Sequence, residues 1–286
     1  MLRIAIQNKG RLSEESVELL HGAGVKFDNV KRKYLVKARN FPTEVLYLRD
    51  DDIPGVVASG SANVGIVGLN EVREKMGDSD AVKIVRKLGF GYCRLCLAIP
   101  KNETYNGLEY FEGKRVATSY PRILKDFFSK HGIKAEIAEI SGSVEITPSA
   151  GMADAIFDIV SSGGTLVSNG LKEVETVLES EAVLITNPNL SEEDQDILNE
   201  LLFRIDSECI SRGKKYLLMN IPTASLEKAI ELLPAMRSPT VMPLAAEGWC
   251  SLHSVVDSSE LWDKVRKLKE IGAEGILVLN LDKIIP

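Results

Sequence analysis

Short apolar segments alternate with amphipathic segments along the first two thirds of the chain, and this alternation restricts the fold more than any other feature. Residues 2–6 and 64–68 are typical of buried strands, whereas residues 13–23 and 121–131 have the spacing of helices. Ser13 is expected to cap the first helix, because acidic residues follow it. Alternation of this kind predicts an α/β fold with a largely parallel sheet.

The other elements predicted up to residue 212 extend this pattern into two lobes. Further strands are expected at residues 34–38, 44–49, 92–99, 115–119, 135–140, 157–160 and 182–185, and further helices after Asp52, around 144–150 and at 191–212. The pattern changes near residues 88–91. We therefore predict a first lobe of residues 1–90 and 184–212 and a second lobe of residues 91–183, with a ligand cleft between them.

The last part of the chain, residues 213–286, predicts a separate domain. Strands are expected at 216–221, 240–244, 251–256 and 275–281, and helices at 224–233 and 261–271. The order β-α-β-β-α-β is that of the ferredoxin-like unit.

Composition and charge exclude several classes of protein. The chain has 286 residues, of which 44% are hydrophobic and 27% are charged, as in an ordinary globular protein. Its formal net charge of −6 argues against a nucleic-acid-binding protein, which would need a basic face. No apolar segment approaches the roughly 20 residues that cross a membrane, and no signal-peptide core is seen. We expect a cytoplasmic protein with neither nucleic-acid nor membrane partners.

Common metal and nucleotide motifs do not explain the sequence. Cys93 and Cys96 form a C-x-x-C inside a predicted strand, where residues three apart point to opposite faces. No second pair of cysteines and no paired histidines follow, so the sequence assigns no metal ligands. The chain also lacks a P-loop motif and an intact G-x-G-x-x-G after its first strand.

A loop rich in glycine and hydroxyl groups is the main candidate for ligand binding. Residues 157–166 read FDIVSSGGTL, an apolar strand followed by Ser161, Ser162, Gly163, Gly164 and Thr165. A helix that starts near Thr165 would add positive potential to the exposed backbone N–H groups, so the loop suits a phosphate. An acidic residue upstream, Asp154, would accept hydrogen bonds from sugar hydroxyls. By composition alone, an ordinary turn between a strand and a helix fits equally well.

Other candidate residues follow predicted strands. Lys9 and Arg11 bracket a glycine before a helix, and Arg49 precedes three aspartates. These cations suit a polyphosphate, but solvated turns explain them as well. Tyr120 ends a strand, where ligands of α/β proteins bind; it either stacks on a base or fills a seam between domains.

Residues 145–166, EITPSAGMADAIFDIVSSGGTL, resemble the signature of the ATP phosphoribosyltransferases, the first enzymes of histidine biosynthesis. The fixed positions of that signature are filled by Glu145, Gly151, Ala153, Ile156, Asp158, Ser162, Gly163, Thr165 and Leu166. The blocks QNKGRLS, RDDDIPG, GYCRLCLA and KRVATSYP occur in the order of the family. The last domain, with SPTVMPLA, resembles the ACT-like regulatory domain of the long form.

The resemblance implies a two-lobed catalytic part similar to periplasmic binding proteins, and a reaction in which N1 of ATP attacks C1 of phosphoribosyl pyrophosphate (PRPP). Magnesium is implied as the cofactor. The PRPP-binding residues would be Glu145, Asp154, Asp158 and residues 161–165. Lys9, Arg11 and Arg49 would act on the charges of ATP and pyrophosphate, and Tyr120 would lie near the nucleotide. No residue is assigned as a general base.

The long form of the family is inhibited by histidine, which binds between regulatory domains, and it assembles as a hexamer built from dimers. The corresponding positions are Asn220, Thr240 and Ala245. An acidic residue would bind the amine of histidine more strongly than Asn220 does.

Two other functions are compatible with parts of the sequence. A two-lobed solute-binding protein with an added sensor domain would bind a ligand without turnover. A purely regulatory amino-acid sensor is supported only by the last domain. The hydroxyl-rich loop and the cations at Lys9 and Arg11 favour phosphate esters, and so favour the enzyme.

Overall fold

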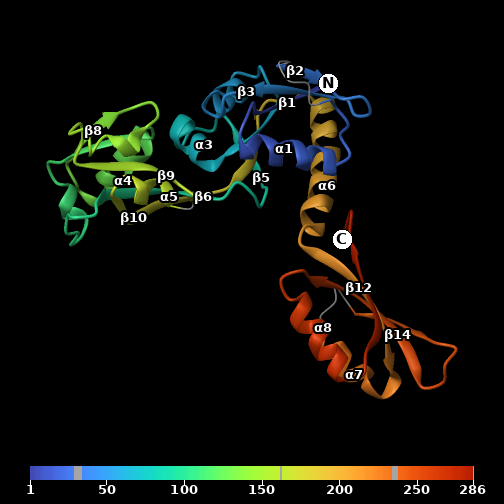
Figure 1. Cartoon of the computed structure of the whole chain (residues 1–286). Coiled ribbons are helices and arrows are strands. Elements are labelled where there is room, and N and C mark those ends of the chain that lie inside the picture. The colour runs from blue at the N-terminus through green and yellow to red at the C-terminus, as the bar shows by residue number, and fades with distance from the viewer. Residues whose placement is uncertain (29–33, 162, 234–237, 286) are drawn as a thin grey trace. The chain divides into compact units, whose positions relative to one another are not determined.

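The computed structural model describes residues 1–28, 34–161, 163–233 and 238–285 (Figure 1). The chain divides into two compact units, one of residues 1–21 and 25–199, and one of residues 22–24 and 200–286. Among the described residues, no helix is both long and apolar enough to span a membrane.

The first unit contains two sheets, each with its own hydrophobic core, which we call lobe I and lobe II. The lobe I sheet has the order β2-β3-β1-β4-β11-β5. Its strands are β1 (Leu2–Gln7), β2 (Leu35–Lys37), β3 (Thr43–Leu48), β4 (Val64–Gly68), β5 (Lys83–Lys87) and β11 (Ala182–Thr186). β1 is parallel to β3 and β4, while β11 is antiparallel to β4 and β5. The helices of this lobe are α1 (Arg11–Gly22), α2 (Ile53–Ala58) and α3 (Leu69–Met76).

The lobe II sheet has the order β10-β6-β9-β7-β8. Its strands are β6 (Cys93–Pro100), β7 (Arg115–Thr118), β8 (Glu136–Glu139), β9 (Ala155–Val160) and β10 (Leu171–Ser180). β7 is parallel to both β8 and β9, so the carboxyl ends of these strands share one edge of the sheet. Helices α4 (Pro121–His131) and α5 (Gly164–Ser168) begin at that edge, after β7 and β9 respectively. The chain passes between the lobes twice, from β5 to β6 and from β10 to β11, as in a two-lobed binding protein.

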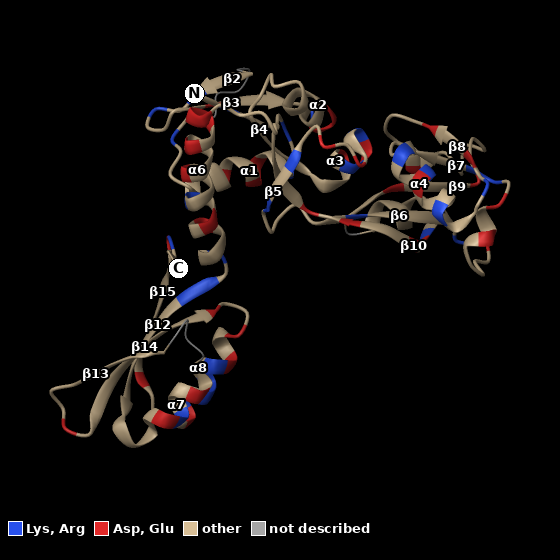
Figure 2. Cartoon of the chain, turned by 180° about the vertical axis from the view of Figure 1, so that it is seen from behind, with Lys and Arg blue, Asp and Glu red and all other residues tan. Residues whose placement is uncertain are grey.

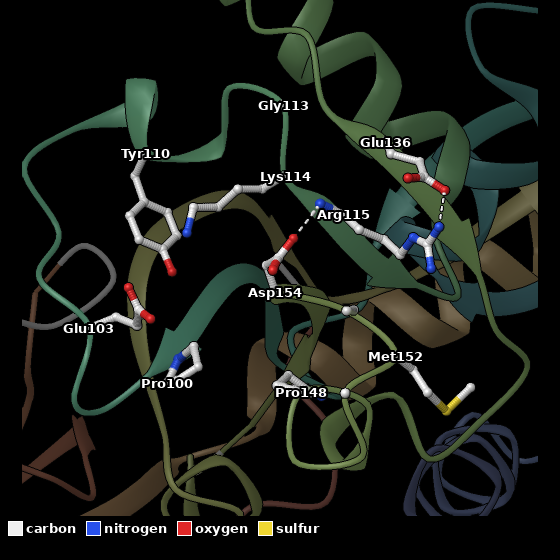
Figure 3. A pocket seen from close by; sticks show the side chains of 12 residues that line it. Pro100, Glu103, Tyr110, Gly113, Lys114, Arg115, Glu136, Pro148, Met152 and Asp154 are labelled. Carbon is white, nitrogen blue, oxygen red and sulfur yellow. Dashed lines mark hydrogen bonds and ion pairs between the residues drawn. The ribbon is translucent and has the colours of Figure 1, made fainter.

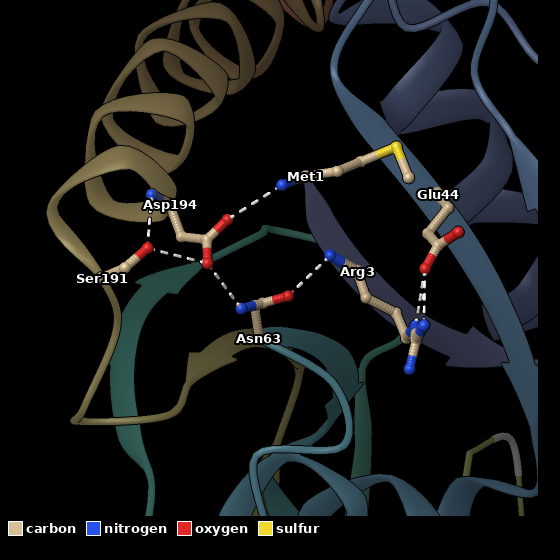
Figure 4. A network of polar contacts seen from close by, with 6 residues as sticks. All are labelled: Met1, Arg3, Glu44, Asn63, Ser191 and Asp194. Atoms are coloured by element: carbon tan, nitrogen blue, oxygen red, sulfur yellow. Dashed lines mark hydrogen bonds and ion pairs between the residues drawn. The ribbon is translucent and has the colours of Figure 1, made fainter.

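The helix predicted at residues 191–212 is α6 (Glu192–Ser211), which begins one residue after Ser191. The Ser191 hydroxyl accepts the Asp194 backbone N–H at 3.1 Å and donates to the Asp194 carboxylate at 3.0 Å. That carboxylate also accepts Asn63 Nδ2 at 3.3 Å and the amino group of Met1 at 3.4 Å (Figure 4). The helix start is thereby fixed to the lobe I sheet, where Arg3 pairs with Glu44 at 2.7 Å.

The second unit contains an antiparallel sheet with the order β13-β14-β12-β15. The elements are β12 (Lys214–Pro222), α7 (Leu226–Leu232), β13 (Thr240–Pro243), β14 (Trp249–Asp257), α8 (Leu261–Glu270) and β15 (Glu274–Asn280). Leu217, Met219 and Leu252 are fully buried in a cluster with Leu268 of α8, so the helices cover one face. The surface of α8 carries charges of both signs (Figure 2). This strand order is the predicted ferredoxin-like one.

Several expectations about elements were wrong. Helix α1 begins at Arg11, so Ser13 lies buried within it and is not its cap. Asp52 precedes α2, but its side chain makes no capping hydrogen bond. In place of a helix around residues 144–150, the structure has a short 3₁₀ turn, Val144–Ile146. Strands β5 and β10 were not predicted.

Candidate active site

Three exposed cations meet at the carboxyl edge of the lobe I sheet. β1 and β3 are parallel, with Gln7 opposite Leu48, and the Asn8 N–H donates to the Leu48 carbonyl at 2.7 Å. Lys9 and Arg11 therefore follow one strand at the point where Arg49 follows its neighbour. The side chains of Arg11 and Arg49 are 66% and 75% exposed. Each has only a loose pairing, Arg11 with Glu15 at 3.8 Å and Arg49 with Asp51 at 3.3 Å, so both can reach a ligand.

The hydroxyl-rich loop occupies the carboxyl end of β9 in lobe II. Ser161, Gly164 and Thr165 are exposed, and Ser162 lies outside the described residues. Gly163 has φ +78°, which permits the sharp turn into α5. The first N–H groups of a helix have no intrahelical acceptor, so the loop presents donors to solvent. Leu166, only 6% exposed, anchors the loop in the lobe II core.

Two carboxylates lie beside this loop. Asp158 is three residues before Ser161, on the strand that carries the loop. Glu145 lies in the 3₁₀ turn Val144–Ile146, which contacts β9. Burial, with a smaller contribution from the charge of Glu145, raises the pKa of Asp158 to about 6. The Asp158 carboxylate accepts the Ile159 N–H at 2.8 Å, and that hydrogen bond opposes the rise. This pair can accept hydrogen bonds from a ligand held by the loop.

Asp154 does not belong to this group, contrary to the expectation from sequence. It precedes β9, whereas the loop follows it, and six residues at roughly 3.3 Å each separate the two ends by about 20 Å. Its carboxylate accepts the Arg115 N–H at 2.8 Å. Asp154 lines an open cleft of about 490 Å³, together with Tyr110 and Lys114 (Figure 3). Asp154 is only seven residues before Ser161 in the sequence, but the extended strand between them keeps Asp154 far from the loop.

Tyr120 is also not a ligand-stacking residue in this structure. It is 9% exposed, and its ring belongs to the lobe II core. Its hydroxyl donates to Glu71 of α3 at 2.9 Å and accepts Asn70 Nδ2 at 3.3 Å. Burial, followed by the Glu71 charge, raises the pKa of Tyr120. In this structure Tyr120 occupies a seam between the two lobes, which is one of the two interpretations that the sequence left open.

The partner of Tyr120 was missed from the sequence. Glu71 follows β4 in the segment GLNEVREKM, where the only signal was a pair of glutamates in a short helix. It is 6% exposed, and burial raises its pKa to about 7, while the Tyr120 hydrogen bond opposes the rise. Because Glu71 and Tyr120 follow strands of different sheets, their hydrogen bond brings the carboxyl edges of lobes I and II together.

The predicted regulatory residues share one face of the C-terminal sheet. Asn220 lies opposite Ser251, and Thr240 lies opposite His253, two residues further along the same strand. Met219 and Ile221 point into the core, so Asn220 points to the face that α7 and α8 do not cover. Thr240 is exposed, and Ala245 lies exposed in the turn after β13.

Among the described residues, no group of three or more His, Cys, Asp or Glu side chains is placed to hold a metal ion. The carboxylates of Glu145 and Asp158 supply oxygen ligands of the kind that magnesium prefers. They fit an ion that is shared with the phosphate groups of a substrate.

Comparison with known proteins gives the family. The model of the ATP phosphoribosyltransferase family matches residues 49–207, and that of the HisG C-terminal domain matches residues 211–283. An ATP phosphoribosyltransferase of Phocaeicola vulgatus is 59% identical over 285 residues, covering 100% of both chains. One of Bacteroides thetaiotaomicron is 56% identical with the same coverage.

A solved structure agrees with the fold. The ATP phosphoribosyl transferase (HisG:HisZ) complex from Thermotoga maritima contains a chain with a TM-score of 0.61 and 27% identity, covering 72% of this chain and 99% of that one. The two-lobed catalytic part and the ferredoxin-like C-terminal domain that the sequence predicted are thus confirmed. The chain belongs to the ATP phosphoribosyltransferase family, the transferases of histidine biosynthesis.

Proposed function

We propose that the protein transfers the phosphoribosyl group of PRPP to N1 of ATP and releases pyrophosphate. The observation that carries this proposal is the hydrogen bond between Glu71 and Tyr120, which joins elements that begin at the two carboxyl edges, in a chain of this family. One edge presents exposed cations, and the other presents a hydroxyl-rich loop beside two carboxylates. Two anionic substrates with a ribose between their phosphates need this combination of charges.

PRPP is assigned to lobe II. Backbone N–H groups of residues 163–165 and the hydroxyls of Ser161 and Thr165 would hold the 5-phosphate, together with Ser162 of the same loop. Asp158 and Glu145 would accept hydrogen bonds from the ribose hydroxyls, in place of Asp154. Asp158 lies on β9 and Glu145 lies in a turn that contacts this strand, so these two side chains would be held in place before the substrate binds.

The cations of lobe I would act on the leaving group and on ATP. The bond from C1 to the pyrophosphate oxygen breaks as N1 of ATP approaches, and positive charge develops on the ribose ring. Lys9, Arg11 and Arg49 would stabilise the negative charge that collects on the pyrophosphate. N1 of adenine has a free lone pair, so no general base is needed to create the nucleophile.

Magnesium would enter with the substrates. Asp158 and Glu145 would hold it together with phosphate oxygens, which is how Mg²⁺ commonly binds in nucleotide enzymes. When bound, the ion neutralises phosphate charge.

The test is pyrophosphate release from the purified protein given ATP, PRPP and magnesium, with each component omitted in turn. Release that requires both substrates supports the transferase. Saturable binding of either substrate without release would favour a two-lobed binding protein, and would overturn the proposal.

We also propose that the C-terminal unit binds histidine as a feedback inhibitor and joins copies of the chain into a dimer and hexamer. The support is the uncovered sheet face, where Leu277, Leu279 and Met242 are 56%, 48% and 45% exposed beside the polar Asn220 and Thr240. Histidine titrated into the same assay should lower pyrophosphate release. Release unaffected by millimolar histidine would contradict this assignment while leaving the transferase intact.

A further inference from the structure

Helix α3 of lobe I makes a row of contacts with lobe II that the proposed chemistry does not use. Asn70, Glu71 and Glu74 are 4%, 6% and 9% exposed, although all three are polar and lie in a helix of eight residues. The positions i, i+1 and i+4 lie on one side of a helix. A buried polar side of this kind needs partners, and lobe II and its connecting strand supply them.

Glu74 caps a helix of the other lobe. Its Oε1 accepts the Arg122 N–H at 2.9 Å, and its Oε2 accepts the Ile123 N–H at 3.0 Å. These are among the first N–H groups of α4, and the residue before that helix, Tyr120, provides no side-chain cap. The carboxylate of Glu74 therefore satisfies two donors that would otherwise lack acceptors, and its charge is favourable at a helix N-terminus.

The neighbouring contacts fix the same helix. Glu71 accepts the Tyr120 hydroxyl at 2.9 Å, directly before α4 begins. Asn70 donates to Glu71 at 2.9 Å and accepts the hydroxyl of Ser180, at the end of β10, at 2.8 Å. At the end of α3, Gly77 has φ +59°, which favours glycine, and the end of the flexible Arg122 side chain approaches it.

We propose that Glu74 and Glu71 are positioning residues, which hold the N-terminus of α4 against α3 and so keep the two substrate-binding edges at a reactive spacing. This inference rests on the proposed transferase function, because only a reaction between two bound substrates requires such spacing. α3 follows β4 at the cation edge, and α4 follows β7 at the edge that carries the loop. The contact therefore joins the elements that begin at the two edges.

The proposal predicts a particular kinetic pattern. The 5-phosphate and ribose of PRPP are assigned to lobe II and ATP to lobe I, so loss of the contact leaves these binding groups intact. The lobe I cations act on the pyrophosphate of PRPP as its negative charge develops, which affects the rate of transfer rather than the binding of the ground state. The approach of N1 to C1 depends on the register between lobes, and a misplacement of about 1 Å lowers a rate by up to about a hundredfold. Loss of the contact should therefore lower kcat and leave both KM values nearly unchanged.

The experiment compares Glu74→Gln with Glu112→Gln in the full-length protein. Glu112 is a matched control, since its carboxylate also accepts a backbone N–H, that of Lys134 at 2.9 Å, but within lobe II. For Glu74→Gln we expect amide hydrogen exchange at Arg122 and Ile123 to accelerate about tenfold or more, because hydrogen bonds to charged groups contribute enough for such a change. We expect kcat to fall about tenfold or more, with each KM within about threefold. The control should match the unsubstituted protein in every measurement.

Unchanged exchange at Arg122 and Ile123 would overturn the capping contact. Faster exchange with an unchanged kcat would overturn the positioning role and leave a merely local contact. If Glu74→Gln does not fold, Tyr120→Phe replaces it, because the ring stays in the core while the hydrogen bond to Glu71 is lost; kcat should again fall with both KM values unchanged. If the unsubstituted protein releases no pyrophosphate, the proposed function fails as well, whereas exchange still reports on the contact itself.

Discussion

In the proposed site, Asp158 of β9 holds the ribose beside the phosphate loop. Asp158→Asn should lower kcat/KM for PRPP by about a hundredfold, because it removes a charged acceptor of the ribose hydroxyls beside the phosphate loop. Asp154→Asn is the matched control, since it removes the same charge just before β9 begins, away from the loop. Initial rates of pyrophosphate release at varied PRPP measure both. Equal losses in the two variants would contradict the placement of the ribose.

Glu71 gives the protein a specific pH dependence. Burial raises its pKa to about 7. The titratable groups that act on Glu71, or are acted on by it, are Tyr120, Asp50, Lys75, Asp51 and Cys93, and Asn70 donates a hydrogen bond to it. A carboxyl group whose pKa is raised in the folded state stabilises the fold fully at pH values below the pKa that it has in the unfolded chain. That stabilisation is lost as the pH rises through about 7, and it is on the order of 3 kcal/mol.

Glu71→Gln removes this titration and keeps a neutral side chain of similar shape. Relative to the unsubstituted protein, the variant should therefore gain free energy of unfolding between pH 5 and pH 8. Urea unfolding at both pH values measures the difference. Two pH profiles that run parallel would show that Glu71 does not titrate in this range.

At the scale of elements, the sequence predicted the helices and strands whose pattern of apolar residues is regular. Val64–Gly68 and Pro121–His131 were placed at their observed bounds, because a fully buried strand and a helix with a proline in its first turn leave clear patterns. β10 was missed, since its register with β6 shifts between Glu173 and Glu175 and again between Thr176 and Leu178. Such irregularities interrupt the period of two that marks a strand.

In the candidate site, too, some residues could be selected from local sequence and others could not. The loop at residues 161–165 and the cations at Lys9, Arg11 and Arg49 follow single strands, so local sequence sufficed to select them. The burial of Tyr120 depends on α3, because its hydroxyl bonds to Glu71, which lies 49 residues earlier in the chain. No local pattern records a contact between helices of different lobes.

The short helix α5 should hold the phosphate loop in place through the packing of its buried residue in the lobe II core. Leu166 is its buried residue, and Leu166→Ala should lower the free energy of unfolding by about 2 to 3 kcal/mol through the cavity it leaves. The loop is then less firmly held, so KM for PRPP should rise. Denaturant unfolding and PRPP kinetics test the two parts. Val167→Ala is the control, because that neighbour is 60% exposed. Loss of stability with an unchanged KM would show that the loop does not depend on this anchor.

For the whole molecule, the uncovered face of the C-terminal sheet predicts self-association. Leu277 lies beside Leu218 in the antiparallel pair of β15 and β12, and its side chain is 56% exposed. Leu277→Asp would place a charge in an apolar interface, where an unpaired carboxylate is strongly unfavourable. We expect this variant to sediment as a smaller species and to lose inhibition by histidine.

Trp262→Asp is the control: it removes a residue that is 80% exposed on α8, the helix that covers the opposite face. Because the proposed active site lies in the first unit, pyrophosphate release without histidine should persist in both variants. An unchanged sedimentation coefficient for Leu277→Asp would show that copies of the chain do not meet through this face.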